Sequence, residues 1–215
     1  MIELQDWGKI DYTEAWARQR EIVKQVQSEE NKNVLVLCEH PSVITIGRAG
    51  SDDNVIPKHD FLEKLGISVI HNDRGGDVTL HNPGQLVGYP IFNLNNFKTD
   101  LHWFLREIEQ VIIDTIAEFG IDSGRMDKLT GVWIDEKRKI CAMGLHCSRW
   151  VTSHGFALNV TNDLREFDYI IPCGITDKLV TSIEQETGTD VDMDTVKKLI
   201  FENFMEHFSK NKFGN

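Results

Sequence analysis

Cys173 is the side chain of this sequence best placed to act as a nucleophile. It stands between Pro172 and Gly174, so the backbone is constrained before the thiol and freed after it. A thiol on such a turn can attack an acyl carbon once it is ionised. The structural alternative is a small buried hydrophobe, the usual role of a free cysteine. We interpret Cys38 and Cys141 in that way, whereas Cys173 lies in no apolar run.

A thiol needs a base or a nearby cation at neutral pH, and Lys139 is one of the basic residues that could supply it. The structural alternative is solvation, since Lys137, Arg138 and Lys139 resemble the charged end of a hairpin. Lys139 differs from its neighbours in opening the predicted strand, which gives its side chain a defined face. A lysine in an apolar pocket also loses its proton more readily. The sequence leaves open whether Lys139 acts as a base or as a cation that stabilises a thiolate.

The segment from Arg74 to Pro90 places an arginine and a histidine next to glycines, which have no side chain. It reads Arg-Gly-Gly-Asp-Val-Thr-Leu-His-Asn-Pro-Gly-Gln-Leu-Val-Gly-Tyr-Pro, and its paired glycines let other groups approach closely. A short strand over 78–80 delivers His81 into a second turn at 82–84. This pattern fits a lined pocket and a plain meander of an α+β domain equally well.

The elements that position these residues follow from apolar periodicity and turn signals. Asp11 is a predicted helix cap, with Glu14 at the third helical position. The predicted strands are 2–7, 34–38, 43–46, 67–71, 131–134, 140–145 and 150–160. The predicted helices are 12–27, 60–65, 101–119 and a last helix that begins at Asp192 or Asp194. The charged turn 135–138 joins two of these strands as a hairpin.

Strands, a helix, a run of strands and a final helix, in that order, predict an α+β fold rather than an alternating doubly wound one. We expect a mixed, largely antiparallel central sheet flanked by helices. The chain has 215 residues, of which 40% are hydrophobic, and it shows no linker or internal repeat. A single domain over residues 1–215 is therefore the simplest prediction.

Charge and cysteine content exclude some classes of protein. With 23 basic and 34 acidic residues the net charge is −11, which argues against a nucleic-acid surface. An acidic partner would need a local basic rim, for which the candidates are Arg48, Arg74, Arg149 and Lys178. No apolar run approaches the roughly 18 residues that predict a membrane span. Without a signal-peptide pattern, we expect reduced thiols and a cytoplasmic location.

Four motifs in order give the sequence a family resemblance. The segment after Arg74 resembles the signature of the lipoyl(octanoyl) transferases, in the superfamily of biotin and lipoate protein ligases. The run 139–144, Lys-Ile-Cys-Ala-Met-Gly, resembles the lysine-bearing strand of that family, and 154–159, His-Gly-Phe-Ala-Leu-Asn, its next strand. The run 171–175, Ile-Pro-Cys-Gly-Ile, resembles its nucleophile loop. Two departures are Leu80, where an aromatic residue is common, and the stretch 145–150, which is usually more basic.

The resemblance implies the fold of biotin and lipoate protein ligase catalytic domains, and an acyltransferase with a Cys173/Lys139 dyad. Such an enzyme moves octanoyl from octanoyl-acyl carrier protein to the target lysine of lipoyl domains, through an acyl thioester on the cysteine. This is the first step of endogenous protein lipoylation, and it needs no cofactor. The implied acceptors are the lipoyl domains of 2-oxoacid dehydrogenase complexes and the glycine cleavage H protein. The implied substrate-binding residues are Arg74, Gly75, Gly76, Asp77, Val78, Thr79, Leu80, His81, Ala142, Met143, Gly144, Gly155, Phe156 and Ala157.

Three alternatives remain at this point. An ATP-dependent lipoate or biotin ligase of the same fold would need the lysine but no nucleophilic cysteine. A non-catalytic protein that binds acyl carriers or lipoyl domains would keep the pocket but lose Cys173 or Lys139. A metal site at Cys141, His146 and Cys147 is disfavoured, because their spacing matches no zinc pattern.

Overall fold

The fold is α+β, as predicted. A computed structural model describes residues 2–29, 31–171 and 179–210. The strands are β1 (Ile2–Lys9), β2 (Asn33–Glu39), β3 (Val43–Ile46), β4 (Ser68–His71), β5 (Val78–His81), β6 (Gln85–Phe92), β7 (Gly124–Met126), β8 (Leu129–Ile134), β9 (Arg138–Ser148), β10 (Val151–Asn159) and β11 (Leu179–Val180). The α-helices are α1 (Tyr12–Ser28), α2 (His59–Lys64), α3 (Leu101–Ala117), α4 (Ile183–Thr187) and α5 (Met193–Lys210).

Two sheets form within these residues. The larger, eight-stranded sheet runs in the order β1-β2-β6-β10-β9-β8-β7, and β11 pairs with β9. The smaller sheet has the order β4-β3-β5. Three pairs are parallel, namely β1 with β2, β3 with β4 and β9 with β11, and the other pairs are antiparallel. The predicted mixed, largely antiparallel sheet is thereby confirmed.

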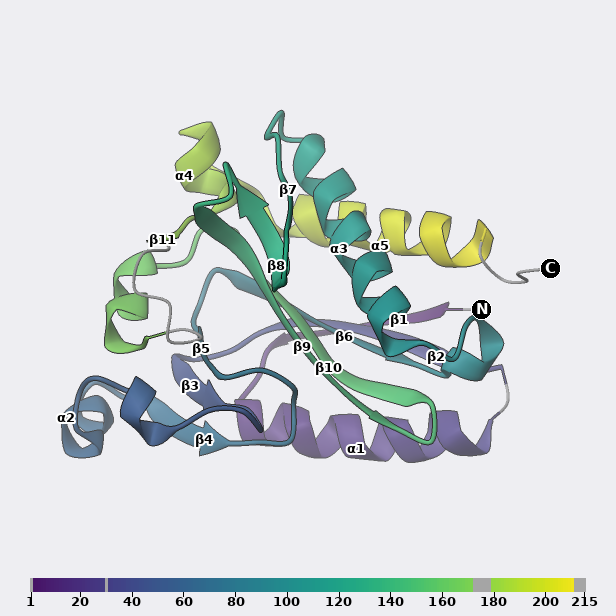
Figure 1. The fold of residues 1–215 in the computed structure, drawn as a ribbon, viewed down its shortest axis with the longest axis horizontal. Helices are drawn as coiled ribbons and strands as arrows, with labels where there is room; N and C mark the ends of the chain where they lie inside the picture. The colour runs from purple at the N-terminus through teal and green to yellow at the C-terminus, as the bar shows by residue number, and fades with distance from the viewer. Residues whose placement is uncertain (1, 30, 172–178, 211–215) are drawn as a thin grey trace.

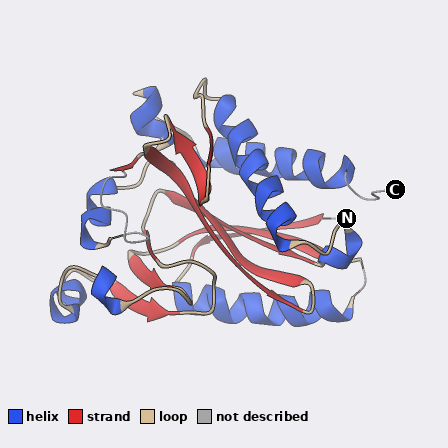
Figure 2. Ribbon diagram, viewed as in Figure 1, coloured by secondary structure: helices blue, strands red, loops and turns tan. Residues whose placement is uncertain are grey.

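Helices cover both faces of the larger sheet. Helix α1 lies along one face, while α3 and α5 lie on the other (Figures 1 and 2). Because successive strand residues point to opposite faces, β2 sends Val34 and Val36 into the core beside α1, and Leu35 and Leu37 into the core beside α3 and α5. Burial on both faces explains the continuous apolar run in this part of the sequence.

Side-chain caps fix the helix starts. Asp11 accepts hydrogen bonds from the backbone N–H groups of Thr13 and Glu14, at 2.8 and 3.1 Å, which confirms the predicted cap. The carboxylate of Glu14 pairs with Arg18 at 2.6 Å. At the last helix, Asp192 rather than Asp194 accepts the backbone N–H of Thr195, at 3.0 Å.

The hairpin of β8 and β9 forms where the sequence predicted it. Asp135 and Glu136 in its turn have φ values of 52° and 55°. Positive φ at both central residues is the geometry of a tight hairpin turn that matches the twist of the flanking strands. This turn fixes which residues of β8 and β9 face each other.

No helix that the structure describes is both long and apolar enough to cross a bilayer. The extent of the domain, residues 1–215, stays a prediction.

Candidate active site

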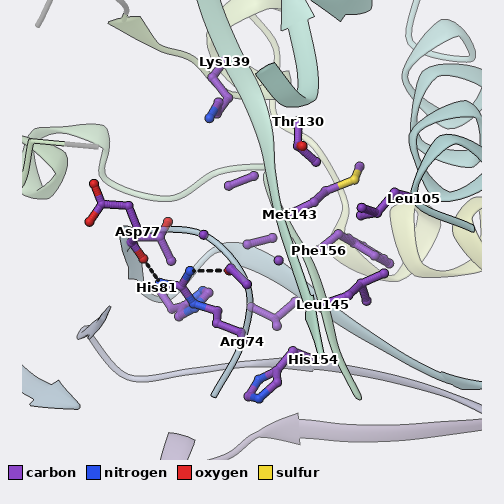
Figure 3. Close-up of a pocket in the computed structure, with 18 of the residues that line it drawn as sticks. Arg74, Asp77, His81, Leu105, Thr130, Lys139, Met143, Leu145, His154 and Phe156 are labelled. Carbon is purple, nitrogen blue, oxygen red and sulfur yellow. Dashed lines mark hydrogen bonds between the residues drawn. The ribbon is translucent and has the colours of Figure 1, made fainter. Parts of the chain in front are cut away.

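A cavity of about 400 Å³ lies where the signature segment crosses the larger sheet. It is lined by residues of the signature segment, of β9 and β10, of α3 and of the turn between β7 and β8. Figure 3 shows Lys139 at one end of this cavity and His154 at the other, with Leu105, Met143 and Phe156 along one side. The cavity therefore combines an apolar wall with a few polar groups, as small-molecule sites do.

Most predicted substrate-binding residues line this cavity together with Lys139. They are Arg74, Gly75, Gly76, Asp77, Val78, Thr79, His81, Ala142, Met143, Gly144, Gly155, Phe156 and Ala157. The structure brings the last six together because β9 pairs antiparallel with β10, so that Ala142 faces Ala157, Met143 faces Phe156 and Gly144 faces Gly155. Their role in binding stays a prediction.

Leu80 is the exception among the predicted residues. It is 0% exposed and packs in the core of the smaller sheet with Ile44 and Ile46. Alternation along β5 places Thr79 and His81 on the face opposite to Leu80. Leu80 therefore does not line the cavity.

Arg74 supports the cavity wall from within. Its Nη2 donates to the carbonyl oxygens of Thr45 and Asp77, at 2.6 and 2.7 Å, and its Nη1 donates to the carbonyl of Gly75 at 3.1 Å. With only 7% of its surface exposed, Arg74 cannot belong to a basic rim. Of the other rim candidates, Arg48 and Arg149 are exposed on separate loops, and Lys178 lies outside the described residues.

Gly144 and Gly155 lie where the backbone of another segment passes close by. A methyl group at Gly144 would lie 2.5 Å from the carbonyl oxygen of Gly75, and one at Gly155 would overlap the carbonyl of Gly88. Such distances are far below van der Waals contact, so both positions require glycine for close packing. Space for a ligand comes from the remaining cavity, not from the missing side chains at these two points.

His81, which lines the cavity, keeps one ring nitrogen unprotonated. The amide nitrogen of Gln85 donates to Asn159 Oδ1 at 2.8 Å and to the carbonyl of Leu80 at 3.2 Å. Gln85 Oε1 must therefore accept from His81 Nδ1, 2.8 Å away, which leaves Nε2 as an acceptor. Burial, with a smaller effect of His40, lowers the pKa of His81 to about 3. The ring stays neutral at physiological pH.

At the opposite end from Lys139, the neutral ring of His154 bonds to an ionised carboxylate. His154 Nε2 lies 2.8 Å from Asp73 Oδ1, and His146 Nε2 lies 3.8 Å from Asp73 Oδ2. The hydrogen bond from His154 is the main reason that the pKa of Asp73 falls to about 2. Burial lowers the pKa of His154 despite this partner. His154 therefore donates through Nε2 and keeps a free lone pair on Nδ1.

These buried neutral histidines predict that stability falls with acid below about pH 6.5. The pKa of His81 is about 3 in the folded protein and 6.5 ordinarily. Between these values the unfolded chain binds more protons, so the free energy of unfolding rises with pH, by about 1.4 kcal/mol per unit for this group. From pH 7 to pH 5 we expect a loss of about 2 kcal/mol from His81 alone. The lowered pKa of Asp73 changes the free energy of unfolding only near and below its ordinary value of 3.8. That range lies outside the interval from pH 5 to pH 7.

Urea unfolding of the wild type and of His81→Gln at pH 7 and pH 5 measures this loss. His81→Gln should flatten the pH dependence, whereas His102→Gln, at an exposed position, should leave it unchanged. Equal slopes for wild type and His81→Gln would contradict the prediction.

Lys139 is fixed between two strands. Val180 of β11 pairs with Lys139 on one side, and the backbone N–H of Thr181 donates to its carbonyl at 3.0 Å. Trp133 of β8 pairs with it on the other side. The Nζ atom lies 4.6 Å from the centre of the Trp133 ring. The predicted defined orientation of this side chain is thus present.

Cys173 lies outside the described residues, so its distance from Lys139 stays a prediction. The described chain on either side is anchored. Ile171 donates its backbone N–H to the carbonyl of Asn54 at 2.9 Å. Leu179, the sixth residue after Cys173, pairs with Arg138. The chain thus returns, shortly after Cys173, to the strand that carries Lys139.

The other three thiols are poor nucleophiles. Cys38 and Cys141 are fully buried, as predicted, and burial raises the pKa of both thiols. Burial also raises the pKa of Cys147. In residues 2–29, 31–171 and 179–210, no group of three or more His, Cys, Asp or Glu side chains is arranged to hold a metal ion.

Several cavity residues were not predicted from the sequence. Tyr12 lies at the start of a predicted helix, Leu101 and Leu105 lie in the predicted helix 101–119, and Thr130 lies in no predicted element. Their residue types give no signal of a cavity, because the same apolar stripe would serve a buried helix. His154 is the exception, because it begins the run 154–159 that resembles a strand of the family.

Comparison with known proteins supplies the family. The lipoyl protein ligase A/B catalytic domain matches residues 11–205. The chain is 46% identical to an octanoyltransferase of Cytophaga hutchinsonii, covering 96% of this chain and 92% of that protein. It is 48% identical to an octanoyltransferase of Solibacter usitatus, with 96% and 91% covered.

A solved structure shares the fold. A lipoate protein ligase from Thermoplasma acidophilum superposes with a TM-score of 0.76, covering 97% of this chain and 85% of that one, at 17% identity. At this identity the likeness concerns the fold alone. The chain belongs to the lipoyl protein ligase A/B catalytic domain family.

Proposed function

We propose that this protein transfers an octanoyl group from octanoyl-acyl carrier protein to the target lysine of lipoyl domains, through a thioester on Cys173. Octanoyl transfer in protein lipoylation is its activity, and it is an acyltransferase. The observation that carries the proposed mechanism is the convergence of Lys139, the signature segment and the paired strands β9 and β10 on one cavity.

The cavity suits an eight-carbon chain. Its volume of about 400 Å³ lies in the range of small-molecule sites. Leu105, Met143 and Phe156 offer apolar contact along one side. Burial of each methylene is worth about 0.8 kcal/mol, so an acyl chain gains much of its affinity from this wall.

The proposed reaction has two steps, transfer of the octanoyl group to Cys173 and then to the acceptor lysine. In each step one bond to the acyl carbon forms and another breaks. The Cys173 thiolate attacks the carbonyl carbon of the donor thioester, the new C–S bond forms, and the C–S bond to the carrier breaks. The carrier leaves as a thiol with the proton that Cys173 gave up. The neutral amine of the acceptor lysine then attacks, the amide C–N bond forms, and the amine proton returns to the sulfur of Cys173. Because the amide is more stable than the thioester, no nucleotide has to supply energy.

The proposed acceptors are the lipoyl domains of 2-oxoacid dehydrogenase complexes and the glycine cleavage H protein. The lipoate protein ligase of Thermoplasma acidophilum, which shares the fold, is paired with an E2 lipoyl domain, and this supports the class of acceptor. We place the reaction in the cytoplasm, because a catalytic thiol has to stay reduced.

A reaction without ATP tests the proposal. Purified protein, octanoyl-acyl carrier protein and a lipoyl domain should yield a lipoyl domain heavier by one octanoyl group in intact mass spectrometry. A parallel reaction with ATP and free octanoate in place of the carrier should yield none. The reverse result would identify an ATP-dependent ligase and overturn the proposal. Replacing the acceptor lysine of the lipoyl domain by arginine is the control for the modified site.

A further inference from the structure

An apolar floor of the cavity crosses three strands of the larger sheet. Ala142 of β9 pairs with Ala157 of β10, and Ala157 pairs with Val87 of β6. Residues that pair across neighbouring strands point to the same face of a sheet, and all three of these residues line the cavity. The floor therefore adds a second apolar surface to the wall that contains Leu105.

The cavity narrows along this floor toward β6. Ala142 is half-buried, whereas only 4% of the surface of Ala157 and 1% of that of Val87 is exposed. Cys38 of β2 pairs with Val87 on its far side, is 0% exposed and does not line the cavity. The floor therefore leads from an open end at β9 to a closed end at Val87.

His40 covers Cys38 at the closed end. Its Nε2 lies 2.7 Å from the hydroxyl oxygen of Tyr89 and 3.5 Å from the Sγ of Cys38, and its Nδ1 lies 2.7 Å from the carbonyl oxygen of Ile10. Because a carbonyl only accepts, Nδ1 carries the proton and the Tyr89 hydroxyl donates to Nε2. The buried ring is thus held from two sides, which fixes the position of the closed end.

The distance from Lys139 to this closed end suits an eight-carbon chain. Ala142 comes three residues after Lys139 on β9, and Val87 lies two strands away from Ala142. At about 3.3 Å per residue and about 4.8 Å per strand, the diagonal from Lys139 to Val87 is about 14 Å. An extended lysine side chain spans about 6 Å and an octanoyl chain about 9 Å, given C–C bonds of about 1.5 Å. Figure 3 shows the amine of Lys139 directed toward the rest of the cavity.

We propose that Val87 is a specificity-determining residue, whose side chain limits how far the acyl chain can extend and so selects eight carbons. This inference rests on the proposed function, because it concerns the acyl donor of that reaction. A shorter chain leaves the closed end unfilled, and each methylene left out of contact lowers the affinity about fourfold. A longer chain meets Val87 and, behind it, the fixed ring of His40.

Transfer from donors of different chain length tests the inference. Hexanoyl-, octanoyl-, decanoyl- and dodecanoyl-acyl carrier protein are each supplied with a lipoyl domain, and kcat/KM is measured by intact mass spectrometry. Val87→Ala removes two methyl groups at the closed end, so the ratio of kcat/KM for decanoyl over octanoyl should rise about tenfold. Val87→Ile adds one methyl group there, so the ratio for hexanoyl over octanoyl should rise about fourfold.

Val36→Ala is the matched control. Val36 belongs to the same core beside α1 as Val87 and is also fully buried, but it does not line the cavity. Its replacement should lower the midpoint of urea unfolding, as Val87→Ala does, and leave the preference for chain length unchanged. A preference that neither Val87 variant alters, or an equal shift in Val36→Ala, would overturn the inference.

Binding of free carboxylates separates this inference from the proposed function. Isothermal titration calorimetry with hexanoate, octanoate and decanoate measures the length preference without transfer. Val87→Ala should shift this preference toward decanoate and Val87→Ile toward hexanoate. Such shifts without transfer by the wild type would refute the proposed function and support the inference, whereas wild-type transfer with no shift would do the reverse. Val87→Ile keeps the core filled, so the test stays valid if Val87→Ala does not fold.

Discussion

Cys173→Ser is expected to lose octanoyl transfer by at least about 10³-fold, because removal of a nucleophile closes the covalent route. A serine hydroxyl is far less ionised than a thiol at neutral pH, and a nearby lysine does not readily deprotonate it. Wild-type protein mixed with octanoyl-acyl carrier protein and no acceptor should gain one octanoyl group. The group should be released by hydroxylamine or by a lipoyl domain, as a thioester is.

The remaining cysteines provide matched controls for this result. Cys38→Ser, Cys141→Ser and Cys147→Ser should each retain the acyl adduct, since burial raises the pKa of all three thiols. Peptide mapping locates the adduct. An octanoyl group on any other cysteine, or undiminished transfer by Cys173→Ser, would refute the proposed mechanism.

Lys139→Ala should fold normally and slow octanoyl transfer by roughly 10²- to 10⁴-fold, the range for removal of a group that assists proton transfer or charge development. The expected loss is in kcat and in the rate of acyl-enzyme formation, measured by quenched-flow mass spectrometry. Lys137→Ala changes a neighbouring lysine that is exposed in the hairpin turn, and it should retain wild-type rates. Near-normal turnover of Lys139→Ala would remove this lysine from the mechanism and favour the solvated-turn interpretation.

Much of the fold could be predicted, because local patterns and tertiary packing agree. The run 34–38 is apolar throughout since β2 is buried on both faces, and the charged turn at 135–138 joins two strands that pair in the structure. Leu80 is an exception, because the resemblance implies a substrate-binding role for the whole stretch 74–81, whereas the structure buries Leu80 against Ile44 and Ile46.

Other features depend on contacts between distant segments. Arg74 was a candidate for a surface rim, but its guanidinium bonds the carbonyl of Thr45 on β3, a partner that no local pattern identifies. The register of β8 against β9 shifts between Val132 and Trp133, close to Gly131, whose backbone N–H donates to a carboxylate of α3. Sequence periodicity locates strands well, but it does not determine such irregularities.

Main-chain hydrogen bonds, besides those of the Arg74 side chain, hold the signature segment in place. The N–H groups of Gly47, Arg48 and Ala49 donate to carbonyls of residues 74–77, and the N–H of Gly75 donates to Leu145 of β9. Backbone hydrogen bonds depend on the path of the chain, and here they join three separate segments of it. Insertion or deletion of one residue would shift every one of them out of register at once. Over evolutionary time this segment should therefore keep its length.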